Sequence, residues 1–570
     1  MPSERFAGMR PYRRERPESL CLMALLSLAY FLRRLSRENA EAVRERCCTD
    51  ECAAGGHQTA SMASSDRSRT PIGGTETLQY CLSMSSFTAR ALVFFTSAAV
   101  LVLEILAGRL LAPYVGVTLE TFTAIIGTVL AGISLGAWLG GRAADRHTPA
   151  RLLGPLLIVG GLLSLAAPTI VELLGPGLSG GEPLEIVVLT ALAFFLPAVV
   201  LSAVPPVVVK LQLADLARTG TVVGRFSAVG TAGAIFGTFI TGFVLLAAFP
   251  TRPVVFGVGT ALVVWGLALM LRFGRRVMTA AALAGIGTLF AGAALATVKG
   301  PCDTETTYYC ARVQVDQQRD SGRVLWLDTV RHSYVDLDDP THLEFRYTRI
   351  IADVVDTQTD PGPVDALFIG GGGFTLPRWL AAVRPGSKST VLEIDDGLVD
   401  IAVDRLGLDP DGFEEIRVGD ARLTLGTFPE SGFDVIVGDA FGGISVPWHL
   451  TTREFLEEVA ARLRADGIYV MNIIDRPPNA FAQAEAATLR EVFTHVAVVA
   501  PPAYLEGASG GNFVFVASQA ALDMETLAAA LQVRAATSIA IAGSEVDNWA
   551  DGAQVLSDDF APVDELLGAR

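Results

Sequence analysis

Two kinds of hydrophobic pattern divide this chain. Between about residues 91 and 298, apolar residues form seven stretches that are each long enough to cross a bilayer, which takes ~20 residues. These stretches cover 91–112, 122–140, 152–171, 186–209, 226–249, 253–271 and 277–298. A soluble core helix carries a polar face, and these stretches have almost none. The pattern predicts an α-helical membrane domain of about seven spans within residues 85–300.

The charges of the short loops predict an orientation. The loops after the second, fourth and sixth stretches contain nine cations, whereas the alternate loops contain only Arg252. The nine are Arg142, Arg146, Arg151, Lys210, Arg218, Arg225, Arg272, Arg275 and Arg276. Because cytoplasmic loops carry the excess of Lys and Arg, the N-terminus is predicted to be inside. If all seven stretches span, everything after Lys299 lies outside the cytoplasm.

Two charged side chains, Glu104 and Arg109, fall inside the first stretch. A charge at that depth is costly and usually faces a protein interior or an aqueous cavity. An internal ion pair, snorkelling toward the interface and a functional role all stay open for this pair. The loop "LGGRAADRHTPAR" resembles the loop between spans two and three of major facilitator transporters, but seven spans are too few for that fold.

From Pro301 onward the pattern changes to short strands. "YYCARVQVD" and "GRVLWLDTVRHSYVDL" are predicted to form an antiparallel pair across the polar turn "QQRDSG". Strand-like runs then alternate with helical stretches such as "TLPRWLAAV", "GLVDIAVDRL" and "TREFLEEVAARLR". The runs are "DALFIG", "STVLEID", "EIRVGD", "FDVIVGDAF", "GIYVMNII", "HVAVVA" and "NFVFVAS". This alternation predicts an α/β Rossmann-like domain of the class I methyltransferase type at 361–570, preceded by a β-subdomain at 301–360.

Composition narrows the choice of partners. The chain has 570 residues, a formal net charge of −16 and a pI near 4.9, which argues against a nucleic-acid partner. A mean hydropathy of +0.43 suits a membrane region joined to one soluble domain. Residues 1–84 are rich in Arg and Ser and hold five of the seven cysteines without a repeated metal-ligand spacing. They are predicted to be a disordered or wrongly assigned N-terminal extension, and no metal site is predicted.

Candidate binding residues lie where successive strands end. Gly370, Gly371 and Gly372 belong to a four-glycine run after the first strand, where the backbone can approach a ligand without a Cβ clash. Glu393 ends the second strand, a position typical of an acid that accepts hydrogen bonds from ribose hydroxyls. Asp420 ends the third strand in "VGDAR", where it is placed to accept from an adenine amino group. Asp439 ends the fourth strand in "VGDAF" and is expected to face the reaction centre.

The motifs "RVLWLD", "DPTHLEFRY", "FIGGGG", "VLEID", "VGDAR" and "FDVIVGDAF…PWHLTTREF" resemble the spermidine synthase (polyamine aminopropyltransferase) family. The resemblance is closer to the membrane-fused branch of that family and covers nearly all of 89–518. It implies decarboxylated S-adenosylmethionine as the co-substrate and a polyamine or other small amine as the acceptor. It also implies that Asp439 holds or deprotonates the attacking amine, and that Tyr309 and Tyr347 contact the substrate.

The chain departs from the family at the amine end of the site. The glycine loop reads "GGGGFTLPR", one residue shorter than usual, with Gly373 near the place of the family's aspartate. The family's Tyr-Gln pair appears as Tyr309-Cys310, and its Tyr-His-Glu triplet appears as Tyr347-Thr348-Arg349. Two functions therefore stay open. One is aminopropyl transfer to a polyamine; the other is a degenerate domain that senses polyamines or nucleosides or serves a transport-related membrane domain.

Two cysteines, Cys302 and Cys310, lie directly after the last apolar stretch. Buried free thiols would suit a cytosolic domain, whereas a disulfide would suit an oxidising compartment. The second interpretation agrees with the loop charges, which favour the outside of the plasma membrane. The sequence thus predicts a multi-pass protein whose partners are the lipid bilayer and a small amine, with an oligomer also open.

Overall fold

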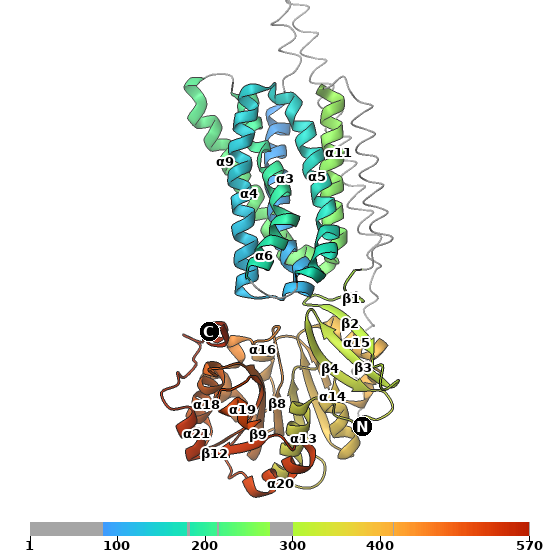
Figure 1. Ribbon diagram of the computed structural model, residues 1–570, viewed down its shortest axis with the longest axis vertical. Coiled ribbons are helices and arrows are strands. Elements are labelled where there is room, and N and C mark those ends of the chain that lie inside the picture. Colours follow the sequence, from blue (N-terminus) through green and yellow to red (C-terminus); the bar gives the residue numbers. More distant parts are fainter. Residues whose placement is uncertain (1–83, 179–182, 214–215, 274–299, 414, 569–570) are drawn as a thin grey trace, which may run out of the picture. The chain divides into compact units, whose positions relative to one another are not determined.

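The computed structural model describes residues 84–178, 183–213, 216–273, 300–413 and 415–568 (Figure 1). The N-terminal extension and the seventh apolar stretch, 277–298, lie outside these residues. The chain divides into two compact units. Within the described residues, the first unit comprises 84–106, 129–167 and 194–273, and the second comprises 107–128, 168–178, 183–193 and 300–568.

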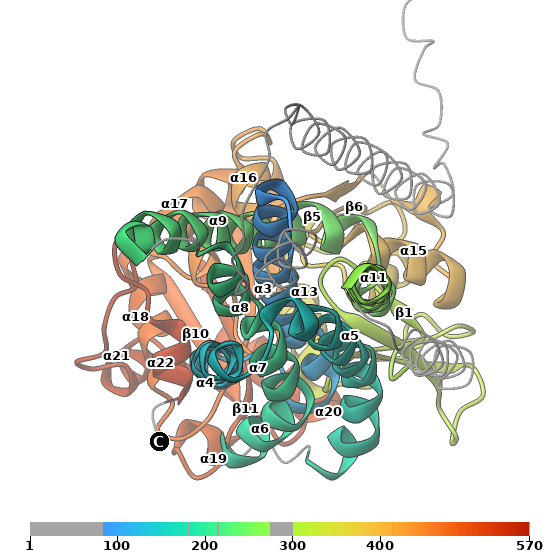
Figure 2. The ribbon, with the colours of Figure 1, turned by 90° about the horizontal axis from the view of Figure 1, so that it is seen from above.

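Six helical segments of the described chain are long and apolar enough to cross a membrane. They are Ser86–Val115, Leu119–Arg146, Pro149–Gly177, Pro183–Gln212, Leu216–Leu245 and Thr251–Arg272. Each contains most of one of the first six predicted stretches, so those stretches are helical as expected. Figure 2 looks along the helix axes and shows α4 (Leu119–Arg146) and α11 (Thr251–Phe273) end-on.

Glycine positions bring helices of the first unit into backbone contact. On α4, a Cβ at Gly136 would meet the main chain of Val199, and one at Gly140 would meet that of Ala203. On α9 (Thr219–Ile240), Gly233 lies in the same way against Phe94 of α3 (Ser86–Val115). Small residues let the helix backbones approach closely. Between membrane helices, such close packing drives association, because lipid is as apolar as the helix surface. A larger residue at Gly136 would push the two helices apart.

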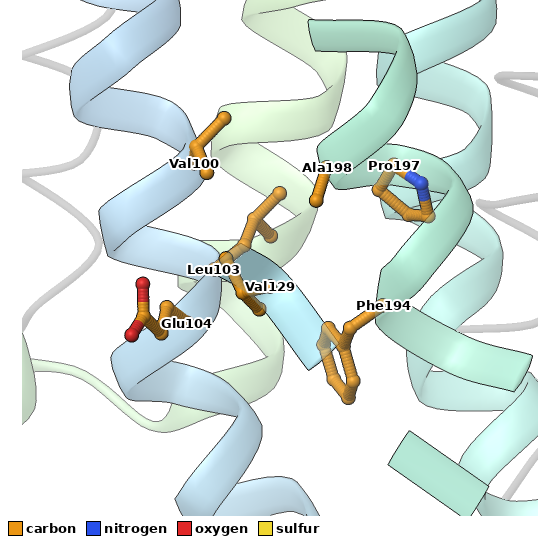
Figure 3. A pocket seen from close by; sticks show the side chains of 7 residues that line it. All are labelled: Val100, Leu103, Glu104, Val129, Phe194, Pro197 and Ala198. Carbon is orange, nitrogen blue, oxygen red and sulfur yellow. The ribbon is translucent and has the colours of Figure 1, made fainter. Parts of the chain in front are cut away.

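Glu104 borders a small cavity of the first unit. One wall of the cavity comes from the helical segment Pro183–Gln212. Phe194 in this wall belongs to a π-helical turn at Ala191–Phe195, a feature found mostly as single turns inside α-helices. The cavity holds about 10 Å³ and is lined by Val100, Leu103, Glu104, Val129, Phe194, Pro197 and Ala198. Figure 3 shows Glu104 on α3 and Phe194 and Pro197 across the cavity from it. The volume suffices for about one water molecule and excludes an organic amine.

The β-subdomain is a four-stranded antiparallel sheet in the order β1-β2-β3-β4. Its strands are Thr304–Glu305, Cys310–Val315, Gly322–Leu327 and Val330–Asp336. The predicted pair is therefore incomplete, because "GRVLWLDTVRHSYVDL" forms two strands rather than one. The chain reverses at Asp328, which adopts a positive φ of 51°, a conformation that Asp tolerates better than most residues. Cys302 and Cys310 form a disulfide, with their Cα atoms 5.1 Å apart.

The second sheet has eight strands in the order β12-β10-β11-β9-β8-β5-β6-β7. They are β5 Asp365–Ile369, β6 Lys388–Glu393, β7 Glu415–Val418, β8 Phe433–Gly438, β9 Leu463–Asp475, β10 His495–Ala500, β11 Gly511–Ser518 and β12 Ile539–Ala542. The neighbouring strands β7, β6, β5, β8 and β9 pair in parallel. The remaining neighbours, from β9 through β11 and β10 to β12, pair antiparallel. The seven predicted runs correspond to β5–β11, and the α/β class with its N-terminal β-subdomain is confirmed.

Helices cover both faces of this sheet (Figure 1). They are α13 Arg346–Gln358, α14 Thr375–Val383, α15 Asp396–Arg405, α16 Ala421–Leu425, α17 Arg453–Arg462, α18 Ala480–Val492, α19 Pro502–Leu505, α20 Met524–Arg534, α21 Ser544–Trp549 and α22 Val563–Gly568. Along β5, Ala366 and Phe368 enter one buried cluster, and Leu367 and Ile369 enter the other. Successive strand side chains point to opposite faces, so β5 is apolar throughout because both faces are buried.

Candidate functional site

A cleft opens at the carboxyl ends of the parallel strands, where ligands bind in such sheets. It encloses about 220 Å³ and is lined by residues that follow β5, β6, β7 and β8 and by the β-subdomain. Six of the predicted site residues line it: Gly370, Gly372, Glu393, Asp420, Asp439 and Tyr309. Gly371 and Tyr347 are in contact with these residues through the hydrogen bonds described below.

The glycine loop wraps around the carboxylate of Glu393. The main-chain N–H groups of Gly371 and Gly372 donate to Glu393 Oε2 at 2.9 and 3.1 Å, and the N–H of Asp395 donates to Oε1 at 3.0 Å. Gly370 has a positive φ of 98°, and a Cβ there would collide with the backbone of Asp439, so only glycine fits. Burial raises the pKa of Glu393 above its usual value, and the three N–H donors oppose that rise.

Asp420 occupies the start of α16. Its Oδ1 accepts from the Arg422 N–H at 2.8 Å and caps this short helix. Its Oδ2 lies 3.4 Å from Nε2 of His449, which also lines the cleft. A carboxylate has about four acceptor sites, so Asp420 keeps acceptor capacity for a ligand beside its structural bonds. His449 was not among the predicted site residues.

The carboxylate of Asp439 is held by side-chain donors rather than by main-chain N–H groups. Asn472 of β9 donates to Asp439 Oδ1 at 2.9 Å, and Asn512 of β11 donates to the Asn472 side-chain oxygen at 3.0 Å. The Tyr347 hydroxyl donates to Asp439 as well. Burial raises the pKa of Asp439 from 3.8 to about 6, although both hydrogen bonds lower it. Asp439 is thus ionised at neutral pH, and its pKa is close enough to neutral pH for the carboxylate to take up a proton.

The β-subdomain supplies a second set of contacts that the sequence did not predict. The N–H of Gly373 donates to Ser333 Oγ at 3.0 Å, and His332 Nδ1 lies 3.1 Å from the same oxygen. Burial lowers the pKa of His332 to about 4, so its ring is neutral at pH 7. Tyr309 donates its hydroxyl to the Phe441 carbonyl at 2.8 Å across the cleft mouth. A hydroxyl and a neutral imidazole therefore stand beside the glycine loop.

The lining of the cleft is strongly one-sided in charge. It contains the carboxylates of Glu393, Asp420 and Asp439, and no Arg or Lys among the described residues that line it. A concave site with one sign of charge attracts ligands of the other sign. In the described residues no group of three or more His, Cys, Asp or Glu is placed to hold a metal ion. The arrangement suits an organic cation.

Comparison with proteins of known function identifies relatives of this chain. No family model matches the chain. It is 32% identical over 220 residues to the polyamine aminopropyltransferase of Vibrio vulnificus, covering 36% of this chain and 71% of that protein. It is 30% identical over 146 residues to the polyamine aminopropyltransferase of Chromobacterium violaceum, covering 25% of this chain and 54% of that one.

Among solved structures, a probable spermidine synthase from Corynebacterium glutamicum matches with 30% identity. The match covers 46% of this chain and 97% of that chain, with a TM-score of 0.43. The similarity to the Vibrio vulnificus protein extends over more than two thirds of its length at more than 30% identity. On that basis, this chain belongs to the polyamine aminopropyltransferase family.

Proposed function

We propose that the α/β domain transfers an aminopropyl group from decarboxylated S-adenosylmethionine to a polyamine, with Asp439 as the residue that accepts the proton. The observation that carries this proposal is the environment of Asp439. Its pKa of about 6 lies near neutrality, and its carboxylate faces the cleft at the end of β8. A carboxylate tuned in this way is suited to remove a proton from an ammonium group.

The proposed reaction is a nucleophilic displacement at carbon. The acceptor ammonium gives a proton to Asp439, and the freed nitrogen lone pair attacks the aminopropyl carbon bonded to the sulfonium. The new C–N bond forms as the C–S bond breaks, and sulfur keeps that electron pair as the neutral thioether of methylthioadenosine. Positioning the two reactants accounts for much of the acceleration in such a step.

The other end of the cleft would hold the nucleoside. Glu393 would exchange part of its hydrogen bonding for the ribose hydroxyls, and Asp420 would accept from the adenine amino group. The contacts of these residues support both roles, because each carboxylate has more acceptor sites than its protein donors fill. The negative lining would also favour the sulfonium and the ammonium groups of the two substrates.

The test is an assay of the purified full-length chain with decarboxylated S-adenosylmethionine and putrescine, in which released methylthioadenosine is measured. Asp439→Asn should reduce kcat by about 10²–10⁴-fold, the usual contribution of a positioned base, and leave nucleoside affinity nearly unchanged. Asp434→Asn is the matched control, because Asp434 lies on the same strand but bonds to Arg464. Turnover that survives in Asp439→Asn would refute the role of Asp439.

A non-catalytic binding domain is the second candidate, and the glycine loop favours it. The N–H groups of Gly371, Gly372 and Gly373 are already satisfied by Glu393 and Ser333. The loop also lacks a carboxylate that would pair with the amino end of the co-substrate. A sensor would bind methylthioadenosine or a polyamine without releasing any product, so calorimetry beside the assay separates the two functions.

We also infer a multi-pass membrane location from the six long apolar helices of the described chain. The loop charges support a cytoplasmic N-terminus and an external α/β domain, provided that 277–298 also spans. Treatment of intact cells with an impermeant protease should then degrade the α/β domain. Full protection of that domain would reverse the proposed side and would leave the enzyme proposal intact.

A further inference from the structure

A short disulfide-closed loop lies at the edge of the proposed nucleoside site. Residues 302–310 are bounded by the Cys302–Cys310 disulfide, and their first strand, β1, pairs with β2. Tyr308 and Tyr309 of this loop line the cleft. The loop is therefore part of the wall that a nucleoside would contact, although it belongs to the β-subdomain and not to the parallel sheet.

Thr306 is the residue around which this loop is organised. Its hydroxyl accepts from the Tyr309 N–H at 2.9 Å and donates to Asp395 Oδ2. The Asp395 N–H in turn donates to Glu393 Oε1 at 3.0 Å. A continuous chain of hydrogen bonds thus runs from Thr306 through Asp395 to Glu393. Thr306 is almost fully buried, with 8% exposure, so water does not compete for these bonds.

Arg109 of α3 holds the other side of Thr306. Both residues belong to the second compact unit. A guanidinium nitrogen of Arg109 donates to the Thr306 carbonyl at 2.6 Å and lies 3.7 Å from Glu305 Oε1. The side chains of Arg109 and Glu305 are each only 18% exposed. Burial raises the pKa of the Asp328 carboxyl, and the Arg109 charge opposes that rise. A charged donor at this distance makes one of the stronger hydrogen bonds in proteins.

We propose that Arg109 is a positioning residue for the cleft. By holding Thr306, it fixes Asp395 and Glu393 at the nucleoside end and Tyr309 at the mouth. Binding of an adenosyl ligand is then coupled to the helix that carries Arg109. This role rests on the proposed function only for the identity of the ligand, an adenosyl compound. Coupling between two sites is reciprocal, so occupancy of the cleft should in turn strengthen the contact between Arg109 and Thr306.

The test uses the full-length chain in detergent and methylthioadenosine as the probe. Arg109→Gln removes the charge. We expect the dissociation constant for methylthioadenosine to rise by roughly tenfold, which is within the usual range of coupling effects. Arg109→Lys keeps a charged donor and should recover most of the affinity. Arg90→Gln is the matched control, because Arg90 lies on the same helix and, within the described part of the chain, donates hydrogen bonds to the neighbouring Ser86. Its affinity should match that of the wild type.

Hydrogen exchange of residues 303–311 gives a readout that needs no ligand. The Tyr308 and Tyr309 N–H groups both donate to Thr306, so Arg109→Gln should speed their exchange while Arg90→Gln should not. Wild-type affinity together with wild-type exchange in Arg109→Gln would overturn the proposal. If the wild type binds no methylthioadenosine, the proposed function fails instead. The exchange comparison then decides the role of Arg109: faster exchange in Arg109→Gln alone supports it, and equal exchange overturns it.

Discussion

The two ends of the cleft hold their carboxylates by different means. At the end proposed to hold the nucleoside, here called the nucleoside end, Glu393 accepts three hydrogen bonds, all from main-chain N–H groups. At the amine end, Asp439 accepts from the side chains of Asn472 and Tyr347. Backbone donors survive substitution of the residues that carry them, whereas side-chain donors do not. The hydrogen bonds to Glu393 thus do not depend on the side chains of the donor residues, whereas those to Asp439 can be changed one donor side chain at a time.

This difference agrees with where the sequence resemblance places the departures of this chain from its family. The sequence resemblance predicts that the strand-end acids Glu393, Asp420 and Asp439 keep the family pattern. It places the altered positions at Gly373, Cys310, Thr348 and Arg349, none of which belongs to the three strand ends. A change of acceptor would proceed at the amine end without disturbing the nucleoside end. Four predictions test this contrast.

The largest effect is expected at the nucleoside end. Glu393→Ala deletes the acceptor of the ribose hydroxyls, and each charge-assisted hydrogen bond contributes about 1.5–3 kcal/mol on deletion. Two such bonds correspond to a loss of roughly 100-fold or more in affinity for methylthioadenosine, measured by calorimetry. Glu393→Gln keeps one acceptor oxygen and should lie between the alanine variant and the wild type. Equal affinities in all three proteins would disprove the assignment of Glu393.

The next effect is the pH dependence of turnover. The pKa of Asp439 is about 6, and the residue must be ionised to accept a proton. We therefore expect kcat/KM to be level above pH 7 and to fall tenfold for each pH unit well below 6, in a profile recorded from pH 4.5 to 9. A profile that stays flat to pH 5 would mean that Asp439 does not act as the base.

Removal of a side-chain donor should move that profile. The hydrogen bond from Asn472 lowers the pKa of Asp439, so Asn472→Ala should shift the acid limb upward by about one pH unit, as expected for ~1.5 kcal/mol. Asn512→Ala loosens Asn472 only indirectly and should shift the limb less. The affinity for methylthioadenosine should not change in either variant. A loss of affinity equal to that of Glu393→Ala would erase the contrast between the two ends.

The smallest effect is on stability. The pKa of Asp439 is higher in the folded state, about 6, than its ordinary value of 3.8, because burial disfavours the charged form. The protein is therefore more stable at low pH, where Asp439 is protonated, and loses this stability as the pH rises from about 4 through about 6. Asp439→Asn should therefore raise the unfolding midpoint of the full-length chain at pH 8 by about 2–4 °C and leave it unchanged at pH 4. An equal shift at both pH values would point to a packing effect instead.

Sequence patterns located most of the fold because its signals are local. The runs from "DALFIG" to "NFVFVAS" are continuous apolar strands, and the acids Glu393, Asp420 and Asp439 follow directly from strand ends. Asn472 and Asn512 could not be assigned in this way, because they meet Asp439 only through the neighbouring positions of β11, β9 and β8 in the sheet. One signal was present: Asn472 is a single polar residue inside the apolar run "GIYVMNII", and buried polar groups need partners.

The turn at Asp328 was missed for a related reason. "VLWLDTVRHSYV" has no glycine or proline, which are the strongest markers of a reversal. Asp328 instead accepts a hydrogen bond from the Cys310 N–H at 3.1 Å, so the neighbouring strand β2 stabilises the turn. The only mark of this reversal in the quoted run is Asp328 itself, a residue type that is common in turns but also occurs elsewhere.

The one-sided charge of the cleft bears on which adenosine compounds could occupy it in a cell. Adenine nucleotides and dinucleotide cofactors carry phosphates, and S-adenosylmethionine itself carries a carboxylate. With carboxylates and no described Arg or Lys in the lining, such molecules would bring like charges together in a partly dry site. Decarboxylation turns the same nucleoside into a purely cationic molecule. The cleft would therefore discriminate among adenosine compounds by the charge of the group attached to the nucleoside as well as by shape.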